Sequence, residues 1–138
     1  MAYVSRDLRE RVTRRANSLC EYCKTAQAIV IEMEIDHIVP ESAGGLTEEL
    51  NLCLACISCN HFKHDFQTGL DPETSQTVQL FNPRTQIWNE HFAWNEQKTH
   101  VIGLTPVGRA TVERMNMNRD LIVKARQRWV QAGWHPPV

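Results

Sequence analysis

The chain has 138 residues, enough for one domain and too few for two independent cores of ordinary size. Its apolar fraction of 42% and charged fraction of 22% are those of a globular protein, and its formal net charge of −1 cannot hold a nucleic acid by bulk charge alone. No apolar run approaches the roughly 20 residues that span a bilayer, and the charged start MAYVSRDLRERV lacks the apolar region of a secretory signal, so we expect a cytoplasmic protein with no membrane partner.

The first half of the chain predicts a helix, two short strands and a second helix. Ser5 is expected to cap a helix from about residue 6 to residue 17, and a period-two pattern from Ile29 to Asp36 predicts a half-buried strand. Pro40 and the Gly44–Gly45 pair indicate a loop. A second strand is expected over residues 51–55, and the run NHFKHDF after Cys59 predicts a short helix.

The second half predicts strands followed by helices. Residues 76–104 are strand-like, with a hairpin formed by residues 87–94 and 99–104. Thr105 and Pro106 are a typical helix start, and a last helix is expected from about residue 119 to residue 132. We therefore expect an α+β fold in one domain over residues 1–138.

The net charge is a cancellation between different parts of the chain. Residues 1–25 carry six basic and three acidic side chains, residues 26–60 carry six acids and no Lys or Arg, and residues 101–138 carry a net +4. An acidic centre rich in Asp, Asn and His suits a hard metal cation, and basic flanks suit a phosphate polymer. Two solvated helices around a loop-rich middle would give the same distribution, so the pattern leaves both interpretations open.

Four of the five cysteines form two C-x-x-C pairs, Cys20 with Cys23 and Cys56 with Cys59. Two residues between thiolates let both sulfur atoms reach one tetrahedral ion, and two such pairs complete a four-cysteine zinc site. The alternative is a redox pair, but neither pair follows a strand and opens a helix. Cys53 is expected to be a buried apolar residue and not a ligand.

A second motif lies between and after the cysteine pairs. It comprises the run Asp36-His37-Ile38-Val39-Pro40, then Gly44-Gly45, Asn51-Leu52, and Asn60, Lys63 and His64 after the last cysteine. From Cys20 to about His64 the sequence resembles the HNH endonucleases, of the His-Me finger type with a four-cysteine zinc site. The C-terminal segments LFNPRTQIW, GLTPVGRATV and GWHPP resemble small stand-alone bacterial HNH proteins, such as those of cyanobacteria.

The resemblance implies a ββα-metal core over about residues 20–68, a strand and helix extension over about 76–138, and a role for each motif residue. His37 is at the position of the general base, and Asp36 at that of a metal ligand. Asn51 corresponds to the residue that orients the loop bearing the base. Asn60 takes the third named position, with Asn in place of His, and His64 matches a further ligand of some members.

The chemistry of these residues fits the implied roles. Histidine has a pKa near 6.5, so a neutral base is present at neutral pH. Asp36 is a hard ligand that suits Mg²⁺ or Mn²⁺, while an imidazole also admits Ni²⁺ or Co²⁺. Asn60 and His64, at i and i+4, are expected on one face of a short helix, where both can bind one ion. Lys63 is expected either to contact a phosphate or to be a solvated helix residue.

The first hypothesis is therefore a metal-dependent DNA endonuclease that acts on duplex DNA, alone or as a homodimer. Basic residues of the first helix and of the C-terminal extension would contact flanking phosphates; the latter are Arg109, Arg114, Arg119, Lys124, Arg126 and Arg128. The second is a non-catalytic, zinc-stabilised nucleic-acid-binding module, in which Asp36 and His37 are structural. An RNA-directed nuclease shares the chemistry of the first hypothesis and differs in substrate.

Overall fold

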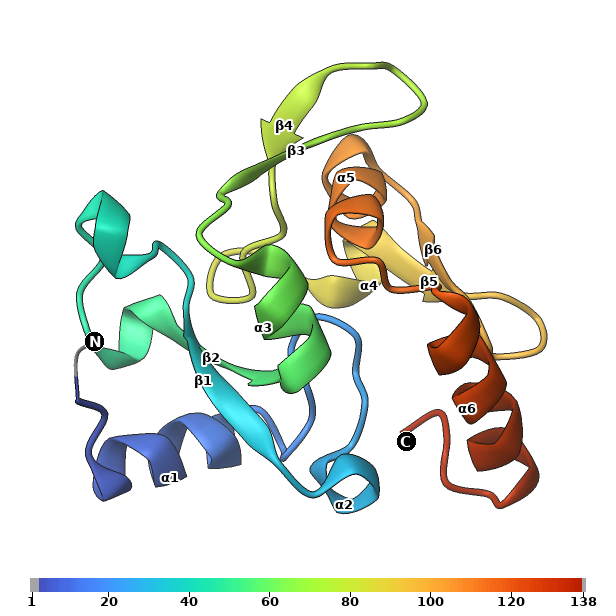
Figure 1. The fold of residues 1–138 in the computed structure, drawn as a ribbon, viewed down its shortest axis with the longest axis horizontal. Helices are drawn as coiled ribbons and strands as arrows, with labels where there is room; N and C mark the ends of the chain where they lie inside the picture. The colour runs from blue at the N-terminus through green and yellow to red at the C-terminus, as the bar shows by residue number, and fades with distance from the viewer. Residues whose placement is uncertain (1–2, 138) are drawn as a thin grey trace.

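A two-stranded antiparallel sheet and one helix form the centre of the molecule (Figure 1). The structure, a computed structural model, describes residues 3–137. Strand β1 (Met33–His37) pairs with β2 (Leu52–Cys56), and α3 (Ile57–Lys63) follows β2 directly and packs on both strands. This β1–β2–α3 unit is the ββα arrangement expected, within a chain of mixed helices and short strands.

The two faces of the β1–β2 sheet have different surroundings, and the side chains of β1 alternate between them. Successive strand residues face opposite sides. Leu52 and Leu54 pack on Val12 of α1 (Arg6–Arg15), on one side. Asp36 lies opposite Cys53 in the strand register, and both residues contact Tyr22 on the other side. The neighbours Asp36 and His37 therefore leave β1 in opposite directions.

The first helix is confirmed with an earlier end. The Ser5 side chain accepts a hydrogen bond from the Leu8 backbone N–H (3.1 Å), as expected of an N-cap. The helix stops at Arg15 because Asn17 and Ser18 adopt left-handed backbone angles, with φ of 55° and 58°. This turn directs the chain into the first cysteine pair.

The predicted strand from Ile29 to Asp36 is wrong in its first half. Residues 27–30 form a single helical turn, α2 (Gln27–Val30), whose start is held by a hydrogen bond from Gln27 N to Ser18 O (2.8 Å). Ile31 then adopts a φ of 72° and a ψ of −60°, with a hydrogen bond from Glu32 N to Val30 O. This is a tight γ-turn. It reverses the chain before β1 begins at Met33.

The helix predicted after Cys59 begins three residues earlier than expected, at Ile57. Cys56 is its N-cap, and the Cys56 Sγ accepts a hydrogen bond from the Cys59 N–H (3.4 Å). The helix ends at Lys63, since His64 has a φ of 49°. Asn60 and His64 are therefore not on one helical face. The intervening loop between β1 and β2 contains two short 3-10 turns, η1 (Glu41–Ala43) and η2 (Glu49–Asn51).

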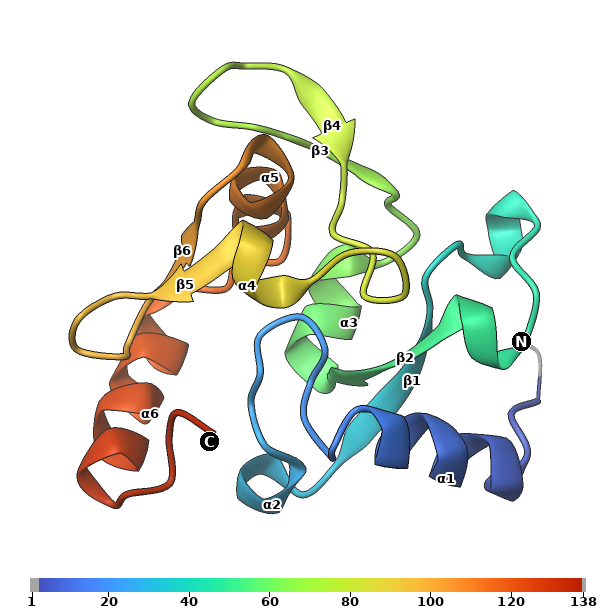
Figure 2. The ribbon, with the colours of Figure 1, turned by 180° about the vertical axis from the view of Figure 1, so that it is seen from behind.

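The C-terminal extension consists of two hairpins and two longer helices, seen from behind in Figure 2 with β5 and β6 in front of α5. Its elements are β3 (Thr68–Leu70), β4 (Thr77–Gln79), α4 (Trp88–His91), β5 (Phe92–Trp94), β6 (Val101–Gly103), α5 (Pro106–Arg114) and α6 (Asp120–Gln131). The hairpin expected from residues 87–94 and 99–104 is present as β5 and β6. It is shorter than expected because α4 takes up its first residues. The pairing of β3 with β4 was not expected from the sequence.

One apolar core joins the extension to the centre. Phe81, Phe92 and Met115 are each at most 3% exposed and belong to the same buried cluster as Tyr22 and the paired cysteines. Helix α5 packs on β3, β4 and β6. Within residues 3–137, no helix has the length and apolar character needed to cross a membrane.

Candidate functional site

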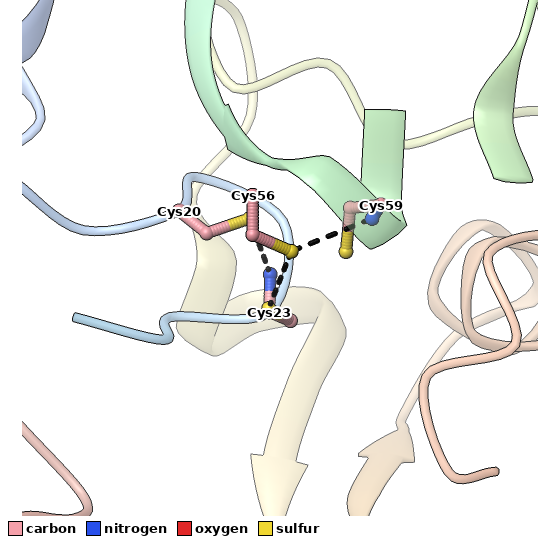
Figure 3. Close-up of side chains that lie close together, drawn as sticks. All are labelled: Cys20, Cys23, Cys56 and Cys59. Atoms are coloured by element: carbon pink, nitrogen blue, oxygen red, sulfur yellow. Dashed lines mark hydrogen bonds between the residues drawn. The ribbon is translucent and has the colours of Figure 1, made fainter. Parts of the chain in front are cut away.

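The four paired cysteines converge on one point (Figure 3). Cys20 and Cys23 lie in the turn after α1, while Cys56 ends β2 and Cys59 lies in the first turn of α3. The expectation that neither pair follows a strand and opens a helix is therefore wrong for the second pair. Their Sγ atoms all lie within 4.8 Å of one another, and the Sγ atoms of Cys23 and Cys56 are 3.7 Å apart. A disulfide would require about 2.05 Å, and the cysteines are free thiols.

The geometry of this cluster fits a tetrahedral metal ion. Zn–S bonds of about 2.3 Å place the sulfur atoms of a tetrahedral site about 3.8 Å apart. Backbone N–H groups approach the sulfur of the first cysteine in each pair, from Cys23 to Cys20 (3.5 Å) and from Cys59 to Cys56 (3.4 Å). The Thr25 hydroxyl lies 3.1 Å from the Cys23 Sγ. The four buried cysteines are thus a candidate zinc site.

The pKa values of the thiols depend on burial and on the neighbouring cysteines. Burial is the main reason why the pKa of Cys20 is raised, with the neighbouring Cys23 and Cys56 adding to it. Hydrogen bonds from the three other cysteines lower the pKa of Cys23 despite its burial. A bound dication favours the thiolate form of every ligand, so these directions describe the metal-free cluster.

Strand β2 and the extension hold the first cysteine pair in place. Glu21 and Leu54 exchange two hydrogen bonds of 2.8 Å, one from the Glu21 N–H to the Leu54 carbonyl and one from the Leu54 N–H to the Glu21 carboxylate. The same carboxylate forms an ion pair with Arg84. The Trp88 Nε1 donates to the Tyr22 carbonyl oxygen (2.8 Å). The cluster is therefore held from both halves of the chain.

The second candidate feature is a groove of about 1280 Å³ that runs along β1. Its wall includes Asp36, His37, Asn60 and His64, which are four of the predicted site residues. Acidic side chains predominate, since Glu32, Glu34, Glu41 and Asp65 also line the groove, together with Arg9 from α1. A polyanion can enter such a groove only if cations offset this charge.

The imidazole of His37 is held at the groove wall by the loop that follows β1. Its Nε2 lies 2.8 Å from the Thr47 hydroxyl and 3.9 Å from a carboxylate oxygen of Glu41. The side chain is 13% exposed, so solvent reaches the ring. With Nε2 donating to Thr47, the neutral ring keeps a lone pair on Nδ1.

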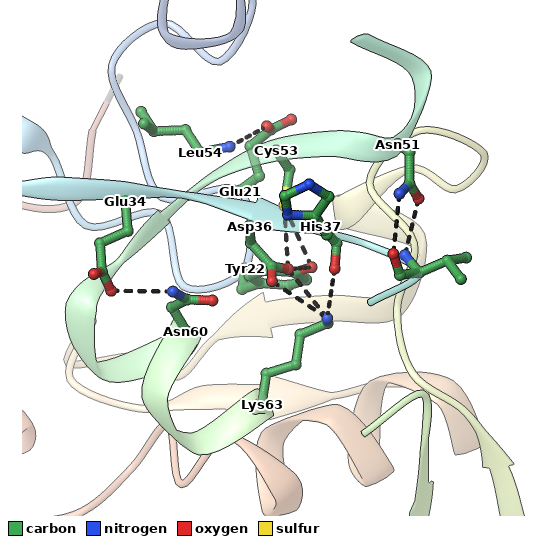
Figure 4. A network of polar contacts seen from close by, with 11 residues as sticks. Glu21, Tyr22, Glu34, Asp36, His37, Asn51, Cys53, Leu54, Asn60 and Lys63 are labelled. Atoms are coloured by element: carbon green, nitrogen blue, oxygen red, sulfur yellow. Dashed lines mark hydrogen bonds and ion pairs between the residues drawn. The ribbon is translucent and has the colours of Figure 1, made fainter. Parts of the chain in front are cut away.

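Asn51 fastens that loop to the end of β1 (Figure 4). Its side chain accepts from the Val39 N–H (2.9 Å) and donates to the carbonyl oxygens of Val39 (3.0 Å) and Leu46 (2.9 Å). Gly45 is required at this point because a Cβ there would lie 1.7 Å from the Val39 carbonyl oxygen. Asn51 thus links Leu46 in the loop to Val39 near the end of β1.

Asp36 belongs to a buried polar network on the α3 side of β1 (Figure 4). Its carboxylate accepts a hydrogen bond from the Tyr22 hydroxyl (2.7 Å) and lies 3.2 Å from the Lys63 ammonium. Lys63 also donates to the His37 carbonyl oxygen (3.1 Å). The pKa of Asp36 is raised because burial outweighs Lys63 and Tyr22, which lower it. Lys63 is 2% exposed, so it holds the end of β1 and does not reach a phosphate at the surface.

Asn60 and His64 occupy different surroundings within the groove. The Asn60 side-chain N–H donates to a carboxylate oxygen of Glu34 (3.0 Å), which leaves its carbonyl oxygen directed away from Glu34, as Figure 4 shows. His64 is exposed and lies beside Asp65, at 3.9 Å. Among the His, Cys, Asp and Glu residues at positions 3–137, the four-cysteine cluster is the one group whose ligand atoms already converge.

The basic residues expected to contact DNA divide into three groups. Lys124 and Arg128 are exposed on α6. Arg114 lies 3.9 Å over the Phe66 ring, and Arg119 donates to the Ser58 hydroxyl (2.9 Å). Arg109 is committed to an ion pair with Asp71 (2.9 Å), and Arg126 is buried.

Arg126 is 1% exposed, with its guanidinium donating to the Thr99 carbonyl oxygen (2.8 Å). A buried guanidinium is not available to a phosphate on the surface. The sequence pattern placed Arg126 among six basic residues of one segment and carried no signal of its burial.

Three residues that contact the motif were not identified from the sequence pattern. Tyr22 lies within the first cysteine pair, Thr47 in the loop, and Glu34 two residues before Asp36 on the same face of β1. The alternation of β1 was the one available signal, since it predicts that Glu34 and Asp36 share a face. No local pattern distinguishes Tyr22 or Thr47 from other polar residues.

Comparison with known proteins identifies one family. Residues 20–66 match the family model described as HNH endonuclease. The matched segment begins at Cys20 and contains both cysteine pairs, Asp36, His37, Asn51 and Asn60. No curated protein and no solved structure shows significant similarity to the chain.

Proposed function

Because residues 20–66 match the HNH endonuclease family model, we propose that the protein is a metal-dependent endonuclease that hydrolyses phosphodiester bonds of duplex DNA. One observation carries the proposal. His37 is partly exposed on the wall of the groove, with its Nε2 fixed by Thr47, and the groove is also lined by the hard oxygen ligands Asp36 and Asn60.

His37 is the general base in this proposal. A phosphodiester is attacked by water in line with the leaving oxygen, and a base must take the proton of that water. The neutral imidazole accepts this proton at Nδ1 while Thr47 accepts the hydrogen bond from Nε2. Asn51 keeps the loop that carries Thr47 against the end of β1, which fixes the direction of the ring.

Asp36 and Asn60, with His64 at the edge, are the proposed ligands of the catalytic ion. Asp36 supplies a carboxylate, and the Asn60 carbonyl oxygen accepts no hydrogen bond from another described residue. Oxygen ligands in an acidic groove suit Mg²⁺ or Mn²⁺, and the His64 imidazole also admits Ni²⁺ or Co²⁺. When bound, the ion supplies positive charge to the phosphate and to the leaving oxygen.

The second metal in the proposal is a structural Zn²⁺ held by Cys20, Cys23, Cys56 and Cys59. It joins the turn after α1 to the junction of β2 and α3. Strand β2 pairs with β1, which carries Asp36, and α3 carries Asn60. Because the chain between these elements is rich in loops, metal binding contributes directly to folding free energy. Cysteines that bind metal and form no disulfide are typical of the reducing cytoplasm, where we place the activity.

Phosphate contacts are proposed for the exposed and half-exposed basic residues. Lys124, Arg128, Arg114 and Arg119 remain in this role, and Arg9 of α1 adds one at the groove itself. These contacts position the duplex and carry no sequence information. A homodimer would bring two such grooves to one duplex and cut both strands.

One observation favours a second candidate function. Asp36 is 5% exposed and is already paired with Lys63, as expected if it serves only to hold β1 on α3. In that case the protein is a zinc-stabilised nucleic-acid-binding module without catalysis. The two functions differ in whether bound DNA is cut.

Nicking of supercoiled plasmid distinguishes them. The protein is incubated with plasmid and Mg²⁺, Mn²⁺, Ni²⁺ or Co²⁺, with and without a chelator that leaves the four-cysteine site loaded, and binding of the same plasmid is measured by gel shift. The endonuclease predicts nicked product with at least one metal and none with the chelator. Binding without nicking under every metal would contradict it and favour the binding module.

A further inference from the structure

Helix α6 contains a buried cation that lacks an anionic partner among the described residues. Arg126 is 1% exposed, and its guanidinium donates to the Thr99 carbonyl (2.8 Å) and to the Asn118 side-chain oxygen (3.3 Å), 5.3 Å from the Trp94 ring. Its Nε is buried without a hydrogen-bond partner. Within residues 3–137, no ion pair joins Arg126 to an Asp or Glu side chain.

This arrangement is costly unless an anion lies nearby. Arginine remains protonated in proteins, so Arg126 cannot relieve its burial by losing a proton. Two neutral oxygen acceptors and an aromatic face solvate a guanidinium but do not neutralise it. Buried charges in folded proteins are paired or coordinate metals.

Two candidate anions share a cavity with Arg126: the exposed carboxylate of Glu32, with which no ion pair is formed among residues 3–137, and the buried four-cysteine cluster. Arg126 shares with Cys23, Cys56 and Cys59 the wall of one cavity of about 260 Å³ between α6 and the cysteine pairs. Burial lowers the pKa of Arg126, and the charges that raise it come from these three thiols. The guanidinium and the cluster therefore lie on one cavity, and their opposite charges would attract each other once the thiols are ionised.

When the cluster holds zinc it is an anion with several cations around it, among them Arg119, which lines the same cavity as Arg126. Zn²⁺ with four thiolates carries a net charge of about −2. Arg126 supplies one positive charge from α6. Lys24, which lies beside Cys23 in the turn and is half-buried, supplies a second.

We propose that Arg126 is the charge partner of the four-cysteine metal centre, so that the C-terminal extension completes a site whose ligands all lie in the HNH segment. Arg126 is a positioning residue, not a ligand. The proposal rests on the metal site and is independent of nuclease activity. It also accounts for an arginine in the apolar contact between α6 and the cysteine cluster.

The test compares three variants purified with zinc. Arg126→Lys keeps the charge, Arg126→Gln keeps hydrogen-bond donors without the charge, and Arg128→Gln makes the same change at an exposed position of α6. Zinc affinity is measured by competition with a chromophoric chelator, and Co²⁺-loaded samples report the tetrahedral thiolate site by their visible absorption.

We expect Arg126→Gln to weaken zinc binding by about 10-fold to 100-fold, the effect typical of a lost partner of a metal site. Arg126→Lys should bind zinc more tightly than Arg126→Gln, and Arg128→Gln should match the parent. Failure to purify the Gln variant with zinc, while the Lys variant loads normally, counts as the expected loss. Equal affinity in Arg126→Gln and the parent would overturn the proposal, as would equal losses in the Gln and Lys variants.

Discussion

The ammonium of Lys63 lies 3.2 Å from the carboxylate of Asp36, and the two side chains are 2% and 6% exposed. Asp36 is the residue for which the motif implies a metal ligand, and Lys63 comes from the last turn of α3. Lys63 also donates to the carbonyl oxygen of His37. One buried cation thus holds both residues of the Asp-His pair against the helix that carries Asn60.

Replacing Lys63 with Met should destabilise the protein by about 3 kcal/mol, because it leaves the Asp36 carboxylate buried with Tyr22 as its main partner. Urea unfolding of the zinc-loaded protein measures this. Lys124→Met, at an exposed position of α6, serves as the control and should change stability by less than about 0.5 kcal/mol.

The double variant Asp36→Asn/Lys63→Met should be more stable than Lys63→Met alone, because it removes the unpaired charge. A recovery of at least about 1 kcal/mol is expected for two residues in direct contact. If the two substitutions destabilise additively, Lys63 and Asp36 are not coupled in the folded protein.

Asn51→Ala should lower the nicking rate by about 100-fold while leaving zinc content unchanged. The substitution removes the hydrogen bonds to Val39 and Leu46, so the loop that fixes His37 loses its attachment to β1. Displacements of about 1 Å at a catalytic group have effects of this size. Asn89→Ala, at an exposed position of α4, is the control. Unchanged nicking in Asn51→Ala would show that the loop needs no such attachment.

Acid should weaken the protein through Asp71. Its carboxylate accepts two hydrogen bonds from Arg109 (2.9 and 3.0 Å), which are the main reason why its pKa is well below the usual range. A carboxyl group with a depressed pKa contributes stability that is fully present above its unfolded pKa of about 3.9 and is lost as the pH falls below it.

Asp71→Asn should therefore lose stability at neutral pH and show a shallower fall in the free energy of unfolding below about pH 4 than the parent. Denaturant unfolding across the acid range measures both slopes. Parallel curves for the parent and Asp71→Asn would mean that this ion pair contributes nothing to the acid sensitivity of the fold.

Ile31→Gly should stabilise the protein by about 1 kcal/mol. A β-branched residue at a φ of 72° is strained by about 1–3 kcal/mol, and the Ile31 side chain is 76% exposed, so little packing is lost. The greater backbone freedom of glycine in the unfolded chain offsets part of the gain. Ile31→Ala keeps the Cβ and should not stabilise. If Ile31→Ala stabilised the protein as much as Ile31→Gly, the gain would come from removing the exposed apolar side chain and not from relieving backbone strain.

The sequence predicted those parts of the fold that depend on local patterns. The cap at Ser5 and the start of α5 at Thr105 follow from residue spacing and turn residues. The ββα arrangement that contains the paired strands β1 and β2 was implied by the resemblance to HNH endonucleases. The cluster of four cysteines was predicted from residue spacing, since two C-x-x-C pairs have few other uses outside redox proteins.

Features that depend on long-range contacts could not be predicted. Ile29 and Ile31 continue the period-two pattern of Met33 and Ile35, but residues 27–30 form a helical turn that begins with the hydrogen bond from Gln27 N to Ser18 O. Lys63 and Arg126 look like surface residues of helices, and only the arrangement of α3 and α6 in three dimensions buries them. Charge counted along the sequence therefore overstates the basic surface offered to DNA.

Removal of the proposed base tests the account most directly. His37→Ala is compared with the parent in plasmid nicking at neutral pH with Mg²⁺ or Mn²⁺, at equal zinc content and equal DNA binding, with His100→Ala in the β5–β6 turn as the control. We predict a loss of about 100-fold or more in the nicking rate for His37→Ala, the contribution typical of a general base. Nicking by His37→Ala within about threefold of the parent would contradict the assignment of His37 and of the groove as the catalytic site.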